Sequence, residues 1–274
     1  MIAVLALFAV VGPTAVVQRP VVNMYSRPSE DADVVSQAIY GANVAVTEQK
    51  DGWARIRTAD QYLGWAPMQA LAPGVYATKG KVAEVRSLFA HIYREASVTK
   101  HAPLITVPFE AHLEVVGDST GDARWLQVRL PDDRAGWVQA GDVTLTPNKM
   151  TIPEMLEFSK RFLGLPYTWG GTSSYGYDCS GFSQMLGRQR GLSMPRDAQP
   201  QAEWSGVIAV DRGALQPGDL LYFGSSEKKI THTGIYLGNG KFINATTYQT
   251  PMVRIDDLSE PHWADLLVAC RRVK

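Results

Sequence analysis

The chain has few cysteines, few histidines and no net charge, and each of these shortages excludes a class of protein. Its 274 residues include two cysteines and five histidines, and 27 basic residues balance 27 acidic ones. Two cysteines do not make the disulfide framework of a small secreted scaffold, although a bond between them stays open. Without net charge, no global field attracts nucleic acid or an anionic membrane. We therefore expect no nucleic-acid partner.

Long apolar runs are also lacking, so we expect no integral membrane span, which would need ~20 such residues. A shorter apolar stretch, Met1–Val11, precedes Gly12-Pro13-Thr14-Ala15. This fits a signal peptide over residues 1–14 and a periplasmic or secreted protein, although no basic residue precedes the stretch. The alternatives are the truncated start of a cytoplasmic protein and a first buried strand.

Two stretches of similar sequence pattern precede residue 150, where the pattern of apolar and polar residues changes. Both alternate apolar and polar residues in short runs separated by Gly, Pro and Asp, which is typical of β-strands and turns. Each ends in a Trp-x-x-[Ile/Val]-Arg run followed by Gly-Trp, at Trp53–Arg57 with Gly64-Trp65 and at Trp125–Arg129 with Gly136-Trp137. This weak repeat of roughly 70 residues predicts two small β-barrels, over 15–73 and 80–146. The Gly-Trp signature resembles bacterial SH3-like domains; a single elongated β-sandwich is the alternative.

Beyond the linker Thr146–Lys149, the surroundings of the two cysteines differ. Cys270 ends the apolar run Leu266–Ala269, as a buried strand cysteine would. Cys179 lies in a Gly-, Ser- and Tyr-rich segment, and the apolar residues after it recur at helical spacing. This pattern predicts a helix whose first turn includes Cys179. The free N–H groups there would lower the pKa of the thiol and could stabilise an oxyanion, so we interpret Cys179 as a nucleophile.

A nucleophilic thiol needs a base, and His232 is the best placed of the histidines. It opens a predicted strand that enters the turn Gly238-Asn239-Gly240, and the return strand contains Asn244. If the turn uses three residues, residue 237 opposes 241 and Asn244 shares a face with His232. A two-residue turn would put Asn244 on the other face. In the first register, Asn244 can bind the far imidazole nitrogen and aim the near one at Cys179.

The order of motifs makes a family resemblance specific. Tyr-x-Trp-Gly-Gly from Tyr167, Asp-Cys-Ser-Gly-Phe from Asp178, Pro-Gly-Asp-Leu at 217–220 and His-x-Gly-Ile-Tyr-Leu-Gly from His232 resemble the NlpC/P60 family. The resemblance implies an α+β, papain-like cysteine peptidase domain over residues 150–274. It also places the third catalytic position, more often histidine, on Asn244. Asparagine serves the same orienting role in papain-like enzymes.

The subgroup with two SH3-like domains implies a substrate. Its members cleave the γ-D-glutamyl bond of L-Ala-γ-D-Glu-diamino acid murein peptides and hold the free amine of L-Ala with an aspartate that matches Asp197. The serine that usually follows is Ala198 here. In these members a tyrosine of the first barrel closes the site, and Tyr62 matches it. The first barrel would then act as a gate that limits which substrates enter the site, whereas the alternative is that it anchors the protein to the cell wall. Asp197 could instead pair with Arg196 or cap a loop.

The remaining expectations concern the groove and the rival functions. Trp169, Asp178 and Ser180 would contact the substrate, and Tyr167 would assist the oxyanion. We see no spacing typical of metal ligands and expect no metal, no cofactor and a monomer. One rival keeps the fold but acts as an amidase or acyltransferase on another substrate. A second rival is a non-catalytic wall-binding protein.

Overall fold

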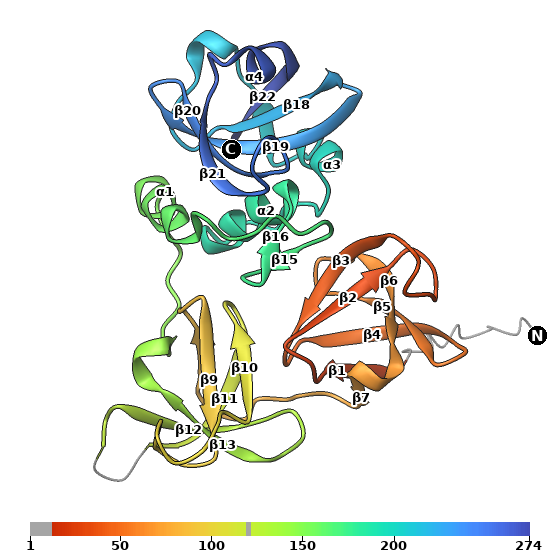
Figure 1. Ribbon diagram of the computed structural model, residues 1–274, viewed down its shortest axis with the longest axis vertical. Coiled ribbons are helices and arrows are strands. Elements are labelled where there is room, and N and C mark those ends of the chain that lie inside the picture. The colour runs from red at the N-terminus through yellow and green to blue at the C-terminus, as the bar shows by residue number, and fades with distance from the viewer. Residues whose placement is uncertain (1–12, 119–121) are drawn as a thin grey trace, which may run out of the picture.

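The computed structural model describes residues 13–118 and 122–274, which form three units in succession along the chain (Figure 1). Each unit has a main sheet of its own. The signal peptide predicted over residues 1–14 lies almost wholly outside the described residues, and Thr14 begins the first strand. Export therefore stays a prediction. In the ranges described, no helix is both long and apolar enough to cross a bilayer.

The first two units are barrels with the same topology. The first contains β1 (Thr14–Val17), β2 (Val21–Tyr25), β3 (Val34–Ile39), β4 (Asn43–Lys50), β5 (Trp53–Arg57), β6 (Leu63–Pro67) and β7 (Leu71–Pro73). The second contains β8 (Val82–Val85), β9 (Phe89–Tyr93), β10 (Ile105–Pro108), β11 (His112–Asp118), β12 (Trp125–Arg129), β13 (Ala135–Gln139) and β14 (Val143–Thr144). The sheet orders are β3-β2-β6-β5-β4-β1-β7 and β10-β9-β13-β12-β11-β8-β14, which match strand for strand. The repeat is thus confirmed as two barrels, and the single sandwich is wrong.

The repeated Gly-Trp pair has a packing reason. A Cβ on Gly64 would lie 2.8 Å from Cβ of Met24, and one on Gly136 would lie 2.5 Å from Cγ2 of Ile92. In both barrels, therefore, the strand that carries Gly-Trp crosses a core side chain too closely for any residue but glycine. A short 3-10 helix follows each of these strands, at Met68–Ala70 and Ala140–Asp142.

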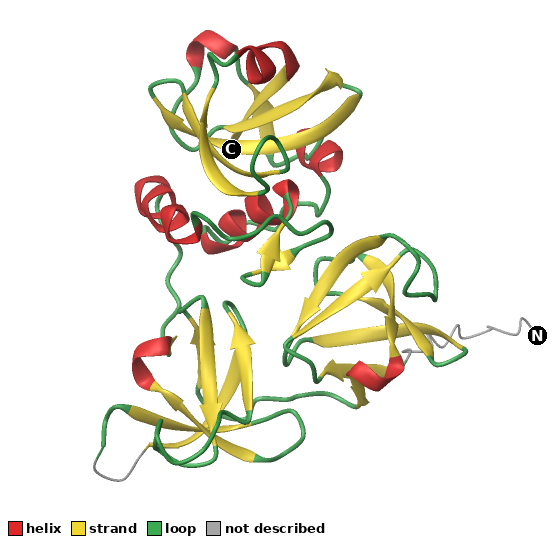
Figure 2. Cartoon of the chain, in the orientation of Figure 1, coloured by secondary structure: helices red, strands yellow, loops and turns green. Residues whose placement is uncertain are grey.

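The third unit packs helices on a six-stranded sheet (Figures 1 and 2). Its helices are α1 (Ile152–Ser159), α2 (Cys179–Gln189), α3 (Ala198–Ala202) and α4 (Pro261–Leu266), with 3-10 turns at Lys160–Phe162 and Arg212–Ala214. The strands are β17 (Val207–Ala209), β18 (Leu220–Ser226), β19 (Lys229–Gly238), β20 (Lys241–Thr246), β21 (Met252–Asp257) and β22 (Leu267–Val273), in the order β17-β22-β18-β19-β20-β21. A small hairpin, β15 (Thr172–Ser173) and β16 (Gly176–Tyr177), precedes α2. The α+β, papain-like prediction is confirmed.

Helix α2 is buried on nearly all sides, whereas its sequence predicts one apolar face. Its apolar residues pack into the largest core cluster, with α1 and one face of the sheet. Its polar side meets both barrels: Gln184 donates to Asp60 (3.1 Å) and Arg188 binds Glu110 (2.7 Å). The helix that begins at Cys179 therefore lies where all three units meet.

Two aromatic side chains join neighbouring units. Phe109, from the second barrel, is 1% exposed and packs in the core of the third unit, with ring centroids 5.4 Å from Phe158 and 5.6 Å from Phe162. Tyr40, from the first barrel, is buried in the core of the second. The barrels are thus packed into the protein rather than tethered to it.

Candidate active site

The start of α2 is built from close backbone packing. Asp178 is the N-cap, and its Oδ1 accepts a hydrogen bond from the Gly181 N–H at 2.7 Å. A Cβ on Gly181 would lie 2.2 Å from the Gly171 carbonyl oxygen, and one on Gly171 would lie 2.3 Å from that of Gly176. The glycines of Trp-Gly-Gly and Asp-Cys-Ser-Gly thus allow the hairpin to lie directly against the helix start that carries Cys179.

Asp178 is held by Arg196 in a buried ion pair. The guanidinium donates to both carboxylate oxygens, at 3.0 and 2.6 Å, and to the Ser180 hydroxyl at 2.9 Å. It also reaches Ser36 of the first barrel at 3.3 Å. The Asp178 and Ser180 side chains, predicted to contact substrate, are thus bonded within the protein. These contacts fix the start of α2, and the contact of Asp178 and Ser180 with substrate stays a prediction.

Cys179 is buried, with 7% of its surface exposed. Burial raises the pKa of its thiol to about 12, and the neighbouring Asp178 carboxylate adds to the rise. The backbone N–H groups of Thr233 and Ser180, together with Arg196, act in the opposite direction. The lowered pKa expected from the helix start is therefore wrong, because loss of solvent outweighs the helix end. Burial therefore favours the neutral thiol over the thiolate.

The hairpin of β19 and β20 brings His232 and Asn244 together by an unexpected route. Its turn has two residues, Asn239 and Gly240, both with positive φ (53° and 74°), and Gly238 opposes Lys241. The predicted three-residue turn is wrong. A bulge at Leu237 restores the register, so that Tyr236 opposes Phe242 and Ile235 opposes Ile243. The next pair in this register places Asn244 opposite Gly234, on the face of His232.

Within that register, the Asn244 Oδ1 lies 2.8 Å from the His232 Nε2. Glycine at position 234 gives the Asn244 side chain the space for this contact. A Cβ at this position would lie 2.7 Å from the Phe242 Cδ2 and 3.1 Å from the Asn244 Cβ. An amide oxygen only accepts, so the His232 Nε2 carries the proton and Nδ1 is free to act as a base.

The His232 ring is packed among aromatic side chains. It stacks on Trp263 of α4, with ring centroids 5.1 Å apart and planes at 29°, and contacts Phe223 on β18. Burial lowers the pKa of His232 to about 4, with the Asn244 hydrogen bond and the Asp256 carboxylate acting in the opposite direction. His232 is therefore neutral at neutral pH, the form that a general base requires.

Cys179 contacts Thr233, the residue that follows His232 in β19. The Thr233 N–H faces the Cys179 sulfur. Successive strand residues point to opposite faces, so Thr233 lies on the α2 face of the sheet and His232 on the α4 face. No hydrogen bond joins the Cys179 sulfur to the imidazole in the part of the chain that the structure describes.

Two aromatic residues predicted for the groove lie differently. Burial raises the pKa of the Tyr167 hydroxyl, and its nearness to Cys179 and Asp178 raises it further. Its phenol stays protonated and can donate a hydrogen bond near the sulfur. Trp169 is 69% exposed, beside Gly170, which packs against Val34 of the first barrel. Trp169 thus presents an open aromatic surface where the first and third units meet.

The first barrel completes the site through Tyr62. Its hydroxyl donates to the Asp197 Oδ2 at 3.0 Å, joining residues far apart in sequence. Burial and this carboxylate raise the pKa of Tyr62 to about 12. The Arg196 guanidinium forms its ion pair with Asp178, and the Asp197 side chain makes no cap hydrogen bond. Asp197 is half-buried and accepts a hydrogen bond from the neutral Tyr62 phenol, while the positive charge of Arg196 acts on it from nearby.

Sequence reasoning missed Arg196 and Trp263 as parts of the site. The sequence suggests only the neighbouring Asp197 as a partner of Arg196, and the separation of Arg196 from Asp178 along the chain does not indicate that they pair. Trp263 lies far along the chain from His232, on a helix whose position the hairpin does not predict. Among residues 13–118 and 122–274, no three or more His, Cys, Asp or Glu side chains are grouped as metal ligands.

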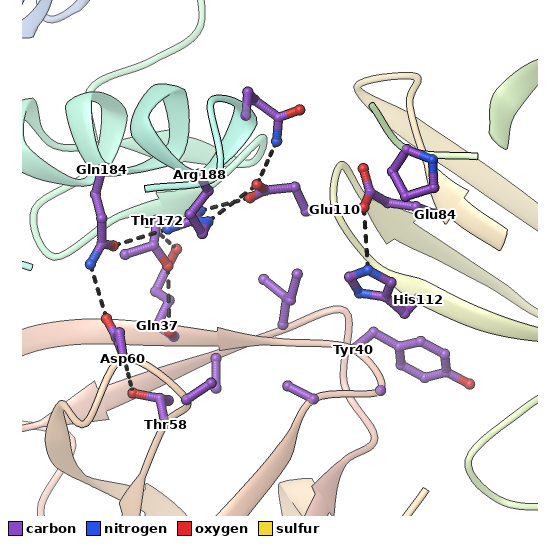
Figure 3. A pocket seen from close by; sticks show the side chains of 18 of the residues that line it. Gln37, Tyr40, Thr58, Asp60, Glu84, Glu110, His112, Thr172, Gln184 and Arg188 are labelled. Atoms are coloured by element: carbon purple, nitrogen blue, oxygen red, sulfur yellow. Dashed lines mark hydrogen bonds and ion pairs between the residues drawn. The ribbon is translucent and has the colours of Figure 1, made fainter. Parts of the chain in front are cut away.

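A separate cavity of about 510 Å³ lies where the three units meet. Figure 3 shows Gln184 and Arg188 of α2 facing Asp60 and Glu110 of the two barrels across it. Neither Cys179 nor His232 lines this cavity. Since Cys179 lies at the other end of α2, the cavity is distinct from the candidate active site.

The fold and this site define a papain-like cysteine peptidase. Comparison with known families matches residues 164–272 to the NlpC/P60 family, 24–71 to the bacterial dipeptidyl-peptidase Sh3 domain and 76–144 to the GW (Gly-Tryp) dipeptide domain. A Bacillus cereus protein named gamma-D-glutamyl-L-lysine dipeptidyl-peptidase is 31% identical over 86% of this chain and 74% of its own length. A Bacillus subtilis protein of the same name is 28% identical over 88% of this chain and 82% of its own.

Solved structures agree on the architecture. The crystal structure of an NlpC/P60 family protein from Bacillus cereus has a TM-score of 0.82 and 23% identity, over 95% of this chain and 99% of the other. An NlpC/P60 endopeptidase from Photobacterium damselae has a TM-score of 0.66 and 15% identity, over 94% and 72%. The chain belongs to the NlpC/P60 family of cysteine peptidases.

Proposed function

We propose that this protein hydrolyses the γ-D-glutamyl bond of L-Ala-γ-D-Glu-diamino acid murein peptides that have a free N-terminal L-Ala. The observation that carries the proposal is the contact of Tyr62 with Asp197, which joins the first barrel to the third unit beside the Asp178–Arg196 pair. The names of the two Bacillus relatives, gamma-D-glutamyl-L-lysine dipeptidyl-peptidase, support the same bond.

A carboxylate with a neutral donor partner suits a cationic ligand. The protonated amine of L-Ala can bind Asp197 as a charge-assisted pair while Tyr62 keeps its hydrogen bond. A preceding sugar or an acetyl group on that nitrogen removes the charge and meets the wall formed by the first barrel. Ala198 supplies no hydroxyl, so Asp197 carries the recognition of the amine. The first barrel then acts as a gate.

In the proposed reaction, substrate binding brings Nδ1 of His232 within hydrogen-bond reach of the Cys179 sulfur. The sulfur then attacks the γ-carbonyl carbon of D-Glu while its proton passes to Nδ1. Burial disfavours a lone thiolate and a lone imidazolium, but this transfer forms both charges together and their attraction offsets part of that cost. The oxyanion accepts hydrogen bonds from N–H groups at the start of α2 and from the Tyr167 phenol.

The intermediate collapses when His232 gives its proton to the amine of the diamino acid and the C–N bond breaks. The acyl group stays on Cys179 as a thioester. Water then attacks the thioester, with its proton taken by His232, and releases L-Ala-γ-D-Glu and the thiol. Asn244 keeps Nδ1 free for both steps.

The test compares wild type, Cys179→Ala and Asp197→Asn on L-Ala-γ-D-Glu-L-Lys and its N-acetylated form. Wild type should cleave only the free peptide. Cys179→Ala should cleave neither, and Asp197→Asn should lose most of the preference for the free amine. Cleavage of the acetylated peptide at the same rate by wild type would refute amine recognition. Absence of cleavage of either peptide would favour a different substrate or a wall-binding protein.

A further inference from the structure

Asn244 is held in turn by two residues of the edge strand β21. In the β20–β21 register, Asn244 opposes Arg254, and Asp256 lies two residues further on the same face. The Asn244 Nδ2 donates to the Asp256 Oδ2 at 2.9 Å and to the Arg254 carbonyl oxygen at 3.3 Å. Asp256 is 2% exposed, and the Arg254 guanidinium pairs with its other oxygen.

These contacts decide which way the Asn244 amide faces. The Asp256 carboxylate and the Arg254 carbonyl accept hydrogen bonds but cannot donate them. If the amide were flipped, its oxygen would lie against both acceptors, at the 2.9 and 3.3 Å now spanned by Nδ2. The amide oxygen therefore faces His232. Because this oxygen can only accept, the Nε2 of His232 must carry the proton and leave Nδ1 bare.

We propose that Asp256 is a positioning residue, which selects the catalytic tautomer of His232 by fixing the orientation of the Asn244 amide. Neither its strand nor its spacing from Cys179 marks it out in the sequence. It acts through Asn244 and touches neither the sulfur nor the imidazole. The inference rests on the proposed function only in taking Cys179 and His232 as the reacting pair.

The decisive comparison is Asp256→Asn against Asp257→Asn. The first keeps the shape and a partner for Arg254, but its amide can donate as well as accept, so that only the Arg254 carbonyl still opposes the flipped orientation of Asn244. The second makes the same chemical change one residue away, where Asp257 pairs with Lys241 on the other face of the strand. Differences between the two variants therefore isolate the contact with Asn244.

The first readout is the tautomer of His232, observed by two-bond ¹H–¹⁵N spectra and assigned with His232→Gln. Wild type and Asp257→Asn should show the proton on Nε2, and Asp256→Asn should show a mixture. A wild-type His232 protonated on Nδ1 would overturn the proposal without any variant. The measurement is made at neutral pH, since Asp256, His262 and Asp178 also act on the charge of this ring.

The second readout is reactivity. Asp256→Asn should lower kcat by about tenfold and leave KM unchanged, because a charge-assisted hydrogen bond is roughly twice as strong as a neutral one. The alkylation rate of Cys179 at neutral pH should fall in parallel, with buried Cys270 as an internal reference. Equal behaviour of the two variants in tautomer, kcat and alkylation would overturn the proposal.

A double variant separates positioning from general damage. In Asn244→Asp combined with Asp256→Asn, the carboxylate at position 244 can only accept from His232, and the amide at position 256 donates to it. The pair is reversed, but the proton on His232 is again placed on Nε2. Recovery of the single tautomer and of alkylation supports the proposal, and a further loss of both contradicts it. If the variants show these tautomer and alkylation effects but wild type cleaves no murein peptide, the proposed function fails and the positioning role stands.

Discussion

Replacing Phe109 with alanine should destabilise the third unit although Phe109 belongs to the second barrel. The ring is 1% exposed, meets Phe158 and Phe162 at centroid distances of 5.4 and 5.6 Å, and has the Arg86 guanidinium over it at 5.5 Å. Phe→Ala in a core costs about 3–5 kcal/mol. The upper part of that range is expected, since the cavity would have walls from two units and cannot easily collapse. The melting temperature should fall by about 8–20 °C.

Denaturant unfolding followed by tryptophan fluorescence measures this change. Phe89→Ala is the matched control, because Phe89 lies in the same barrel and is 36% exposed, and its ring meets the third unit at Tyr175 (centroids 4.9 Å apart), outside the core cluster that contains Phe109. It should cost less than about 1 kcal/mol. Phe109→Ala should also lower peptidase activity at temperatures well below its melting point, since α2 loses support. A change in unfolding free energy equal to that of Phe89→Ala would refute the view that the barrel is packed into the catalytic core.

Four further predictions concern the site itself. The pKa of His232 is about 4 in the folded protein and 6.5 in its ordinary state, so the unfolded chain takes up this proton first. The neutral His232 side chain therefore contributes fully to the free energy of unfolding above pH 6.5, and this contribution is lost as the pH falls toward 4. In His232→Gln, the free energy of unfolding should depend less on pH over that interval. For the same reason, kcat/KM should hold down to pH ~5, and an acid limb near pH 6.5 would contradict the packed environment of His232. Tyr62→Phe should raise KM for free-amine peptides roughly threefold to tenfold in steady-state kinetics and leave kcat unchanged; an unchanged KM would exclude Tyr62 from recognition. Arg196→Gln should cost about 3–5 kcal/mol in urea unfolding, because Asp178 is left as a buried, unpaired charge; a cost below about 1 kcal/mol would contradict that pairing.

Much of the fold could be predicted because its signals are local. The repeated Gly-Trp strands, the linker near Thr146 and the helix after Asp178 each depend on neighbouring residues. The packing between units could not be predicted. Phe109 and Tyr40 look like ordinary barrel residues, and only the docked arrangement shows that each fills the core of another unit.

The site shows the same division between local and long-range effects. The pairing of His232 with Asn244 was predicted from strand parity, yet through the wrong turn, since a bulge at Leu237 has no sequence signal here. The pKa of Cys179 was predicted in the wrong direction because the helix start is visible in the sequence whereas its burial is not. The contacts of Asp178 and Ser180 with Arg196 could not be predicted, because Arg196 lies in a separate segment.

The central claim is that Cys179 forms a covalent thioester with the γ-carbonyl of D-Glu. Wild type mixed with L-Ala-γ-D-Glu-L-Lys, quenched in acid within the first turnover and mapped by mass spectrometry, tests it directly. The account predicts an L-Ala-γ-D-Glu adduct on the peptide that contains Cys179, none on the peptide that contains Cys270, and none after Cys179→Ala. Turnover of the peptide by Cys179→Ala, or an adduct on another residue, would contradict it.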